Sequence, residues 1–588
     1  MHSSLSHFAN IWIVVAAVRA QPGERTEPRT IVAMNFDTKH VIENSHRNGF
    51  VEHPYTLGAD CLLVTTNGPE LVGCHLALGW PVPARLLDLL VEFKNISNGR
   101  SGRLVGGLAG ALIWFGENAT GTQRHGEAPD QIRTEVNAVA RLFNAMLPSL
   151  DLGRALLRGR FISASAAIDA TGVPVDQQIL SQLKHNWPRI RDTIVDGIDA
   201  QYGVHINRLF RADLFKNWIN RRGISWPLSP DGGLDLGDNA FREMARAYPE
   251  VQPLKELRAT LKHFDPRNIT VGLDGRNRSP LRPFASRTSR NQPSANASIF
   301  CTAAWVRNLV RPSVGYGLAL IDWQQQEFGI AAALSGDLTM QNAYQSGDPY
   351  MALAIAAGAA PPGATRSTHS HERELFKLCA LGVQYGMGSG RLAQMLDMPI
   401  SSAKELLNQH QSRFRTFWSW LDGVESQAAS SGVLHSVFGW RMSSESAKSA
   451  RGLRNFPMQA NGAEMLRLAC CQSVERGVTI CTVIHDALLI EAPLAHLDQA
   501  IETTERMMEE ASETVLAGFP LRTEVRIIKA PNRWAEIRGE SVWSAVERVL
   551  RDNSGIDGPA HQRDETCSTA HSRSISLSPH KEAPQGGN

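Results

Sequence analysis

The sequence has few cysteines, no long hydrophobic run and little net charge, and each of these absences narrows what the chain can be. Its eight cysteines include no Cys-x-x-Cys pair, so we expect neither a cysteine-ligated zinc site nor a redox pair. We interpret them as reduced thiols of a cytoplasmic protein. The longest early apolar run, residues 11–18, is too short to cross a membrane and lacks the flanks of a signal peptide. We therefore expect a buried or poorly ordered N-terminal segment and no membrane contact.

The charge balance decides little about partners. The 60 lysines and arginines nearly cancel the 58 aspartates and glutamates, which leaves a formal net charge of +2. A large enzyme can hold a local basic groove at such a balance, so nucleic acid is neither required nor excluded. Hydrophobic residues make up 43% and charged residues 20% of the 588 residues. This is an ordinary globular composition, long enough for about three to four domains.

Changes in the hydrophobic pattern predict an α/β multidomain fold. From residue 552 the end of the chain is rich in Ser, His, Pro and Gly and holds too few apolar residues to fold. Its His561, His571 and His580 fit a solvated tail better than a metal site. The divisions that we predict are an N-terminal segment over 1–30, an α/β domain over 31–150, a helical region over 151–265, a mixed α/β domain over 266–537, and a terminal helix with a disordered tail over 538–588.

Two acidic residues end apolar strands that lie far apart in the chain. Residues 318–322 predict a strand that ends in Asp322 and leads into a helix, and residues 478–491 predict a hairpin with His485-Asp486 at its tip. Paired carboxylates at one sheet edge would bind the magnesium ions of a phosphoryl transfer. Two plainer interpretations stay open: Asp322 as a helix N-cap, and His485-Asp486 as an ordinary polar turn.

A third segment carries residues of functional character at every fourth position. Arg373, Lys377, Leu381 and Tyr385 fall along one drifting face of a predicted helix that Gly386 ends. The two cations can grip phosphate oxygens, and the leucine and tyrosine offer an apolar surface to a base or a sugar. An amphipathic helix with a solvated basic edge would show the same spacing.

Taken in this order, the three segments resemble motifs A, B and C of the family A DNA polymerases, the DNA polymerase I type. The family's Asp-Tyr-Ser-Gln-x-Glu reads here as Asp322-Trp-Gln-Gln-Gln-Glu327, and its His-Asp-Glu as His485-Asp486-Ala487. The helix from Arg373 to Gly386 resembles Arg-x3-Lys-x3-Phe/Tyr-x3-Tyr-Gly. Shorter similarities are Gly172-Val-Pro-Val-Asp176 at the thumb entry, Thr288-Ser-Arg290 at the primer-template, Arg451 with Asn455-Phe-Pro-Met-Gln459 beside the template groove, and Asn532-Arg-Trp534 near the end.

The resemblance implies a right-hand polymerase, with palm, fingers and thumb, over about residues 151–534. It would add dNTPs to a primer on template DNA, as a monomer associated with the nucleoid and with accessory partners unknown. Asp322 and Asp486 would bind two Mg²⁺ ions, with Mn²⁺ as a possible substitute, and Lys377 would protonate the pyrophosphate. The nucleotide-binding set would be Arg373, Lys377, Leu381, Tyr385, Glu327 and His485, with Glu327 blocking a ribose 2′-hydroxyl. The DNA-binding set would be Arg290, Arg451, Asn455 and Gln459.

The pattern departs from the family at three positions. Leu381 replaces the aromatic residue that faces the sugar, Gly329 the arginine that ends motif A, and Ala487 the motif C glutamate. Because both aspartates and Lys377 are retained, we expect an active enzyme. The alternative is a catalytically impaired protein that binds primer-template DNA. A single-subunit RNA polymerase shares the two aspartates, but Glu327 argues against it.

The first α/β domain stands where the family carries a ribonuclease-H-like 3′-5′ exonuclease. Met34-Asn35-Phe-Asp37 stands where Asp-x-Glu would be, and Gln131 with Glu135 where Tyr-x3-Asp would be. An amide supplies no negative charge for a two-metal site, so we predict this fold with little or no proofreading. Asp88 is a candidate for an intermediate acid, although its surroundings favour a solvated helix position.

Overall fold

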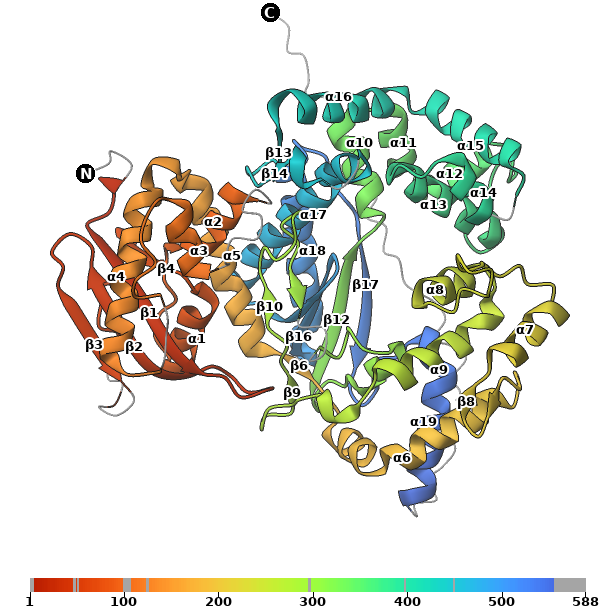
Figure 1. The fold of residues 1–588 in the computed structure, drawn as a ribbon, viewed down its shortest axis with the longest axis horizontal. Helices are drawn as coiled ribbons and strands as arrows, with labels where there is room; N and C mark the ends of the chain where they lie inside the picture. Colours follow the sequence, from red (N-terminus) through yellow and green to blue (C-terminus); the bar gives the residue numbers. More distant parts are fainter. Residues whose placement is uncertain are drawn as a thin grey trace, which may run out of the picture.

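The computed structural model describes residues 5–45, 49, 52–98, 107–122, 126–293, 298–395, 398–447 and 450–554. An N-terminal unit, a group of upper helices and a group of lower helices surround a central sheet (Figure 1). Residues 555–588 lie outside the described part, and so do the predicted tail and its three histidines. Among the described residues, no helix combines the length and the apolar character that a membrane crossing requires.

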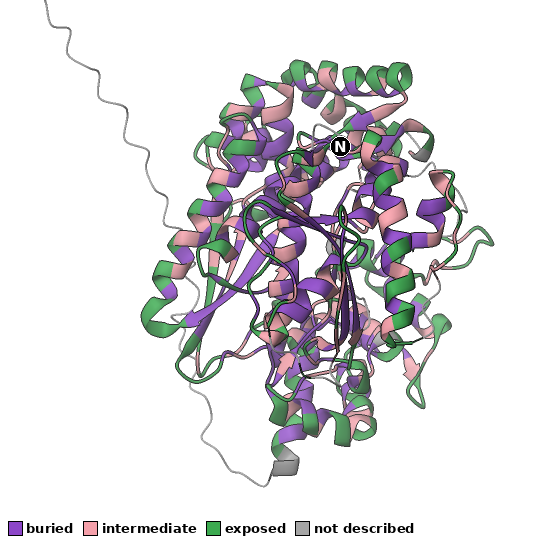
Figure 2. Ribbon diagram, turned by 90° about the vertical axis from the view of Figure 1, so that its left-hand side faces the viewer, coloured by how far each residue is buried: buried purple, intermediate pink, exposed green. Residues whose placement is uncertain are grey.

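The N-terminal unit is a five-stranded mixed sheet with helices on both faces. Its strand order is β3-β2-β1-β4-β5, with β1 antiparallel to β2 and parallel to β4. Strands β1, β2, β4 and β5 are mostly buried (Figure 2), whereas the residues of the edge strand β3 are half-buried or exposed. The elements are β1 (Asn10–Arg19), β2 (Glu27–Asn35), β3 (Val41–Ser45), β4 (Cys61–Thr65), β5 (Leu86–Asp88), α1 (Gly68–Leu78), α2 (Leu89–Ser97), α3 (Gly107–Trp114) and α4 (Pro129–Met146).

The N-terminal boundary that we predicted is wrong, because residues 11–18 form most of the central strand of this sheet. Alternate side chains of β1 point to opposite faces. Trp12 and Val14 pack in the cluster that contains α1, whereas Ile13 and Val15 pack in the cluster that contains α4. Burial on both faces explains the continuous apolar run. The N-terminal unit therefore begins before residue 31.

Helix α5 (Leu152–Thr171) leads out of the N-terminal unit. It packs against α1 and β5 on one side and against elements of the central domain on the other. It thus joins two units and does not belong to the helical region predicted from residue 151. The lower helices form a separate core, which the C-terminal helix joins by packing on α6 and α9. They are α6 (Gln177–Asp199), α7 (Ala212–Arg221), α8 (Asp238–Ala247), α9 (Gln252–His263) and α19 (Glu540–Ser554).

The central sheet is antiparallel, with strand order β15-β16-β12-β17. The side chains of β12 alternate between the two faces of this sheet. Ala319 and Ile321 pack in the hydrophobic core on one face, and Leu318 packs in the core that contains the lower helices. Helix α18 packs on β12, β16 and β17. The elements are β12 (Tyr316–Trp323), β15 (Thr479–Ile484), β16 (Ala487–Pro493), β17 (Thr523–Lys529), α17 (Ala450–Glu475) and α18 (Leu497–Val515).

The upper helices follow β12 in the chain and stand above the sheet (Figure 1). A short hairpin, β13 (Val433–His435) and β14 (Arg441–Ser443), leads from them to α17. The upper helices are α10 (Gln326–Ser335), α11 (Leu338–Gln345), α12 (Pro349–Ala356), α13 (Ser370–Gln384), α14 (Ser389–Met395), α15 (Ile400–Arg413) and α16 (Arg415–Ser431).

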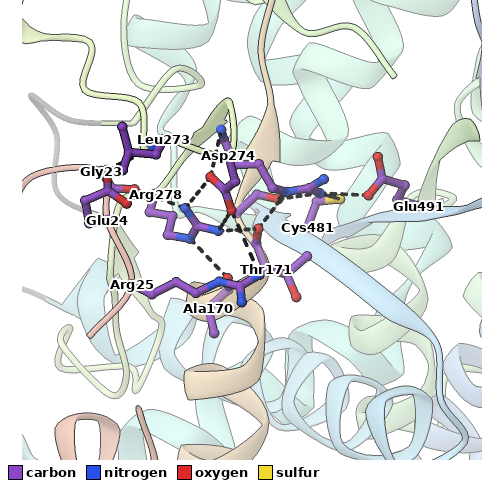
Figure 3. A network of polar contacts seen from close by, with 12 residues as sticks. Gly23, Glu24, Arg25, Ala170, Thr171, Leu273, Asp274, Arg278, Cys481 and Glu491 are labelled. Carbon is purple, nitrogen blue, oxygen red and sulfur yellow. Dashed lines mark hydrogen bonds and ion pairs between the residues drawn. The ribbon is translucent and has the colours of Figure 1, made fainter. Parts of the chain in front are cut away.

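Three two-stranded ribbons occur among the described residues. In the first, β6 (Val173–Pro174), which lies between α5 and α6 in the chain, pairs with β9 (Arg276–Asn277). The guanidinium of Arg276 donates to the carbonyls of Thr171 and Gly172 and to the carboxylate of Glu491. Figure 3 labels Thr171 and Glu491 of this network. A second ribbon pairs β10 (Leu281–Arg282) with β11 (Gln292–Pro293), and a third pairs β7 (His205–Ile206) with β8 (Leu209–Phe210).

Candidate active site at the edge of the central sheet

The two predicted aspartates meet at one edge of the central sheet. Asp322 is the penultimate residue of β12, and Asp486 lies in the turn between β15 and β16. Ile321 pairs with Leu488 across the two strands, so the hairpin tip lies beside the end of β12. The strand and the hairpin that the sequence predicts are confirmed. The N-cap alternative is wrong, because the N-cap of α10 is Gln325.

Without a bound cation, the surroundings of this edge disfavour the ionised forms of Asp322 and Asp486. Burial raises the pKa of the Asp322 carboxyl, and the negative charges of the neighbouring Asp486 and Glu524 raise it further, to about 8. Burial also raises the pKa of Asp486. Within the described structure, Oδ1 of Asp322 is buried and has no hydrogen-bond partner. A cation bound between the two carboxylates would relieve both the repulsion and the unmet acceptor.

The donor set at this edge fits magnesium. Mg²⁺ binds through one or two carboxylates and completes its shell with water and substrate phosphates. Asp322 and Asp486 supply two such carboxylates, and the described part of the chain holds no group of three or more His, Cys, Asp or Glu residues arranged to bind a metal. The edge therefore suits a metal that arrives with a phosphorylated substrate better than a closed structural site.

A polar cluster of four residues lies next to the aspartates and centres on Glu327, in the first turn of α10. Nε2 of Gln459 donates to Oε1 of Glu327 at 2.6 Å, and Nη2 of Arg290 lies 3.5 Å from the same oxygen. The hydroxyl of Tyr385 donates to Oε2. Burial raises the pKa of Glu327 in spite of these donors. The cluster joins residues from four segments that the sequence analysis had assigned separately to nucleotide and DNA.

Helix α13 confirms the predicted helix, but its two cations face different surroundings. Arg373 is buried; its Nε donates to Asp348, its Nη1 lies 2.9 Å from Glu374, and its guanidinium lies over the Tyr350 ring. Lys377 is 39% exposed and has Glu374 at 3.7 Å. Four-residue steps drift by about 40° each around a helix, which turns Arg373 inward toward α12. We expected both side chains to be open for binding phosphate. In this structure, only Lys377 of the two has a partly exposed cationic group.

The remaining predicted residues lie around this cluster. Gly386 ends α13 with a φ of +70°, and a Cβ there would meet the Arg451 side chain at 3.7 Å. Arg451 and Asn455 precede Gln459 by eight and four residues on α17, so the three share one side of that helix. His485 is exposed at the hairpin tip, with a φ of +59°.

Packing accounts for two of the three departures from the family pattern. A Cβ at Gly329 would lie 2.5 Å from Leu521 and 3.1 Å from the ring of Tyr344, so the arginine of the pattern has no room there. Ala487 is buried at the start of β16. Leu381 is half-buried, and nothing in the structure explains why it replaces an aromatic residue.

In the N-terminal unit, the loosely matched residues serve the fold. Oδ1 of Asn35 accepts from the backbone N–H groups of Asp37 and Thr38 at the end of β2. The solvated position expected for Asp88 is wrong, because this carboxylate is buried and accepts from the N–H groups of Gly68, Leu90 and Val91. It thereby holds the starts of α1 and α2, and burial raises its pKa to about 6. On α4, Gln131 is exposed and Glu135 half-buried.

Three residues near the site escaped the sequence analysis. Asp348 caps α12 and binds Arg373, Tyr350 lies beneath the same guanidinium, and Glu524 pairs with Asp322 across β12 and β17. The sequence Asp348-Pro-Tyr350 signals a helix start, which predicts the cap but not the ion pair. The alternating pattern of side chains in β17 does not indicate which strand it pairs with, so the sequence did not place Glu524 beside Asp322.

The chain is similar to known DNA polymerases over part of its length. Residues 297–536 match the family model described as DNA polymerase family A. DNA polymerase I of Aquifex aeolicus is 23% identical over 391 residues, which cover 63% of this chain and 66% of that protein. The DNA polymerase of Mycobacterium phage D29 is 24% identical over 396 residues, 64% of each chain. Thermostable DNA polymerase I of Thermus thermophilus is 26% identical over 234 residues, 37% of this chain and 27% of that protein.

The chain thus matches between about a quarter and two thirds of the length of these relatives. Among solved structures, the POL domain of Pol1 from M. smegmatis, in complex with DNA primer-template and dNTP, matches with a TM-score of 0.69 at 18% identity. The match covers 90% of this chain and 96% of that chain, and it establishes a mixed α/β polymerase-domain fold. Residues 297–536 are therefore similar to DNA polymerase family A.

Proposed function

We propose that the chain is a template-directed DNA polymerase, which joins the α-phosphate of a dNTP to a primer 3′-oxygen and releases pyrophosphate. The observation that carries this proposal is the half-buried pair of Asp322 and Asp486 at one sheet edge, with an unmet carboxylate oxygen. The cluster around Glu327 contains side chains from α10, α13, α17 and the loop that ends near Arg290, and the half-exposed Lys377 lies on α13 as well. Their arrangement supports a site for a nucleotide and a primer end side by side.

Different residues of the chain would have different roles in this reaction. Asp322 and Asp486 would hold two magnesium ions, which supply activation of the 3′-hydroxyl and neutralisation of phosphate charge. The Lys377 ammonium would donate to the triphosphate and protonate the departing pyrophosphate. Glu327, fixed by Gln459, would block a ribose 2′-hydroxyl.

We infer the parts of a right hand from the arrangement of the units. The central sheet would be the palm, α10–α16 the fingers, and α6–α9 with α19 the thumb, with primer-template DNA between them. The order and directions of the five N-terminal strands support a ribonuclease-H-like fold for that unit. We propose that it has little or no proofreading activity, because the side chains of Asn35 and Asp88 are engaged by backbone N–H groups.

Extension of a labelled primer on a DNA template, with Mg²⁺ and all four dNTPs, tests the proposed function. We expect the wild-type chain to add the nucleotides that the template specifies and Asp322→Ala and Asp486→Ala to add none. A parallel binding assay with the same DNA separates the alternative. Salt-sensitive binding without any extension would leave a primer-template-binding protein on a polymerase fold.

A further inference from the structure

Outside α5, the described polar contacts between the N-terminal unit and the rest of the chain lie at two places, the loop between β1 and β2 and helix α2, where Asn95 also accepts from the backbone N–H of Arg441 at 2.8 Å. At the first place, the loop between β1 and β2 lies beside Leu273, Asp274 and Arg278 (Figure 3). The carbonyl of Gly23 accepts from Arg278 at 3.1 Å, and the Glu24 carboxylate accepts from the backbone N–H of Leu273 at 2.8 Å. This contact holds a joint between units and lies away from the candidate active site.

The second contact lies at α2, whose C-terminal end docks on residues 285–290. Nζ of Lys94 donates to the carbonyl of Ala285 at 2.7 Å, and Nδ2 of Asn98 donates to the carbonyl of Arg287 at 3.2 Å. Asn98 is buried. Both donors bind backbone carbonyls of the segment.

Residues 285–290 lie in the loop between β10 and β11, and the loop has an unusual backbone. Phe284 and Ser289 are non-glycine residues with φ values of +55° and +61°. Such conformations persist where the surroundings fix them, and they gather at functional sites. Here Phe284 is fully buried, and Arg467 of α17 donates to the carbonyl of Ser289 at 2.9 Å.

The loop ends at Arg290, one of the four members of the Glu327 cluster. Its backbone N–H donates to Oγ of Ser286 at 2.8 Å, and its guanidinium lies 3.5 Å from Glu327. The side chain is 40% exposed. A chain of direct contacts therefore runs from α2 through the loop backbone to a cation at the candidate active site.

We propose that α2 of the N-terminal unit positions Arg290 for binding the primer-template, with Lys94 and Asn98 as positioning residues. The proposal rests on the proposed function. It gives the N-terminal unit a use that needs no nuclease chemistry, since the carbonyl of Ala285 accepts from Lys94, and the carbonyl of Arg287 accepts from Asn98 as well as from Nε1 of Trp440 at 2.9 Å. Without those donors the strained loop has more conformations, and Arg290 spends less time beside the DNA.

The test measures the Kd for a fluorescent primer-template by anisotropy, without dNTPs, for the full chain. The double variant Lys94→Met with Asn98→Ala removes both donors and keeps most of the buried carbon, and we expect it to raise the Kd about tenfold. The dNTP KM should stay within about twofold. In an Arg290→Ala background the same two changes should have little further effect, because coupled residues are not additive.

The matched control is Glu24→Ala, which weakens the other contact of the same unit and should leave the Kd unchanged. Asn98→Ala alone serves as the milder variant, with the thermal unfolding midpoint measured for each protein. An unchanged Kd, an equal loss in Glu24→Ala, or a loss that persists in full in the Arg290→Ala background would overturn the proposal. Failure of the proposed function would show separately, as a wild-type chain that binds the DNA but extends no primer.

Discussion

At the scale of single residues, the largest electrostatic cost at the site falls on Asp322. Its pKa of about 8 lies above the ordinary value, so the folded state binds a proton that the unfolded state releases. Without metal, stability should therefore fall as pH rises from about 4 through 8. We expect Asp322→Asn in EDTA to match the wild type at pH 5 and to unfold about 2–4 °C higher at pH 8. Equal midpoints at both values would contradict this cause.

Glu327 offers a second test at this scale. Its carboxylate is held by Gln459 and Tyr385, so its position is fixed before substrate arrives, and we propose that the sugar of the nucleotide binds beside it. We expect Glu327→Ala to raise ribonucleotide incorporation, as kcat/KM relative to the matching dNTP, by about tenfold or more. Glu405→Ala, on α15 of the same group of helices, is the control. Unchanged selectivity in Glu327→Ala would remove this residue from sugar selection.

The sequence predicts single residues well where they end an element and poorly where their partner is distant. Asp322 and Asp486 could be found because each follows an apolar strand. Asp348 was missed because its ion pair with Arg373 depends on how α12 packs against α13, which no local pattern encodes. Asp88 was misplaced because a carboxylate that caps two helices looks, in sequence, like any polar helix residue.

At the scale of elements, α13 carries two cations with different roles. Arg373 is buried with Asp348, whereas Lys377 is half-exposed. Breaking a buried pair is costly, so Arg373→Met should lower the free energy of unfolding by about 2–4 kcal/mol. Lys377→Met should change it by less than about 0.5 kcal/mol and weaken dNTP binding about tenfold. Denaturant unfolding and dNTP titration of both variants check this; similar stabilities would show that Arg373 does not anchor the helix.

Element boundaries followed from sequence where the hydrophobic period was clear. The hairpin of β15 and β16 and the helix from Arg373 onward are as predicted. The run at residues 11–18 was misjudged because a strand buried on both faces has no alternation to reveal it. Helix α5 was assigned to the lower helices because its sequence is helical, although its packing ties it to α1 and the central domain.

At the scale of the whole molecule, we propose that the N-terminal unit has an exonuclease-like fold without the expected carboxylates. In the absence of dNTPs, we expect the chain with Mg²⁺ to leave a labelled primer intact. A 3′-mismatched primer should persist as well, and addition of EDTA should change neither result. Metal-dependent shortening of the primer would show that other acids of this unit form a nuclease site.

The central claim is that Asp322 and Asp486 form one metal-dependent site for nucleotide addition. The most direct measurement is the single-turnover rate of adding one templated dNMP, as a function of Mg²⁺ concentration, for the wild type, Asp322→Asn and Asp486→Asn. The account predicts a rate roughly 10³-fold lower or more in each variant, with the primer-template Kd within about threefold of wild type. A rate within tenfold of wild type in either variant would contradict the claim.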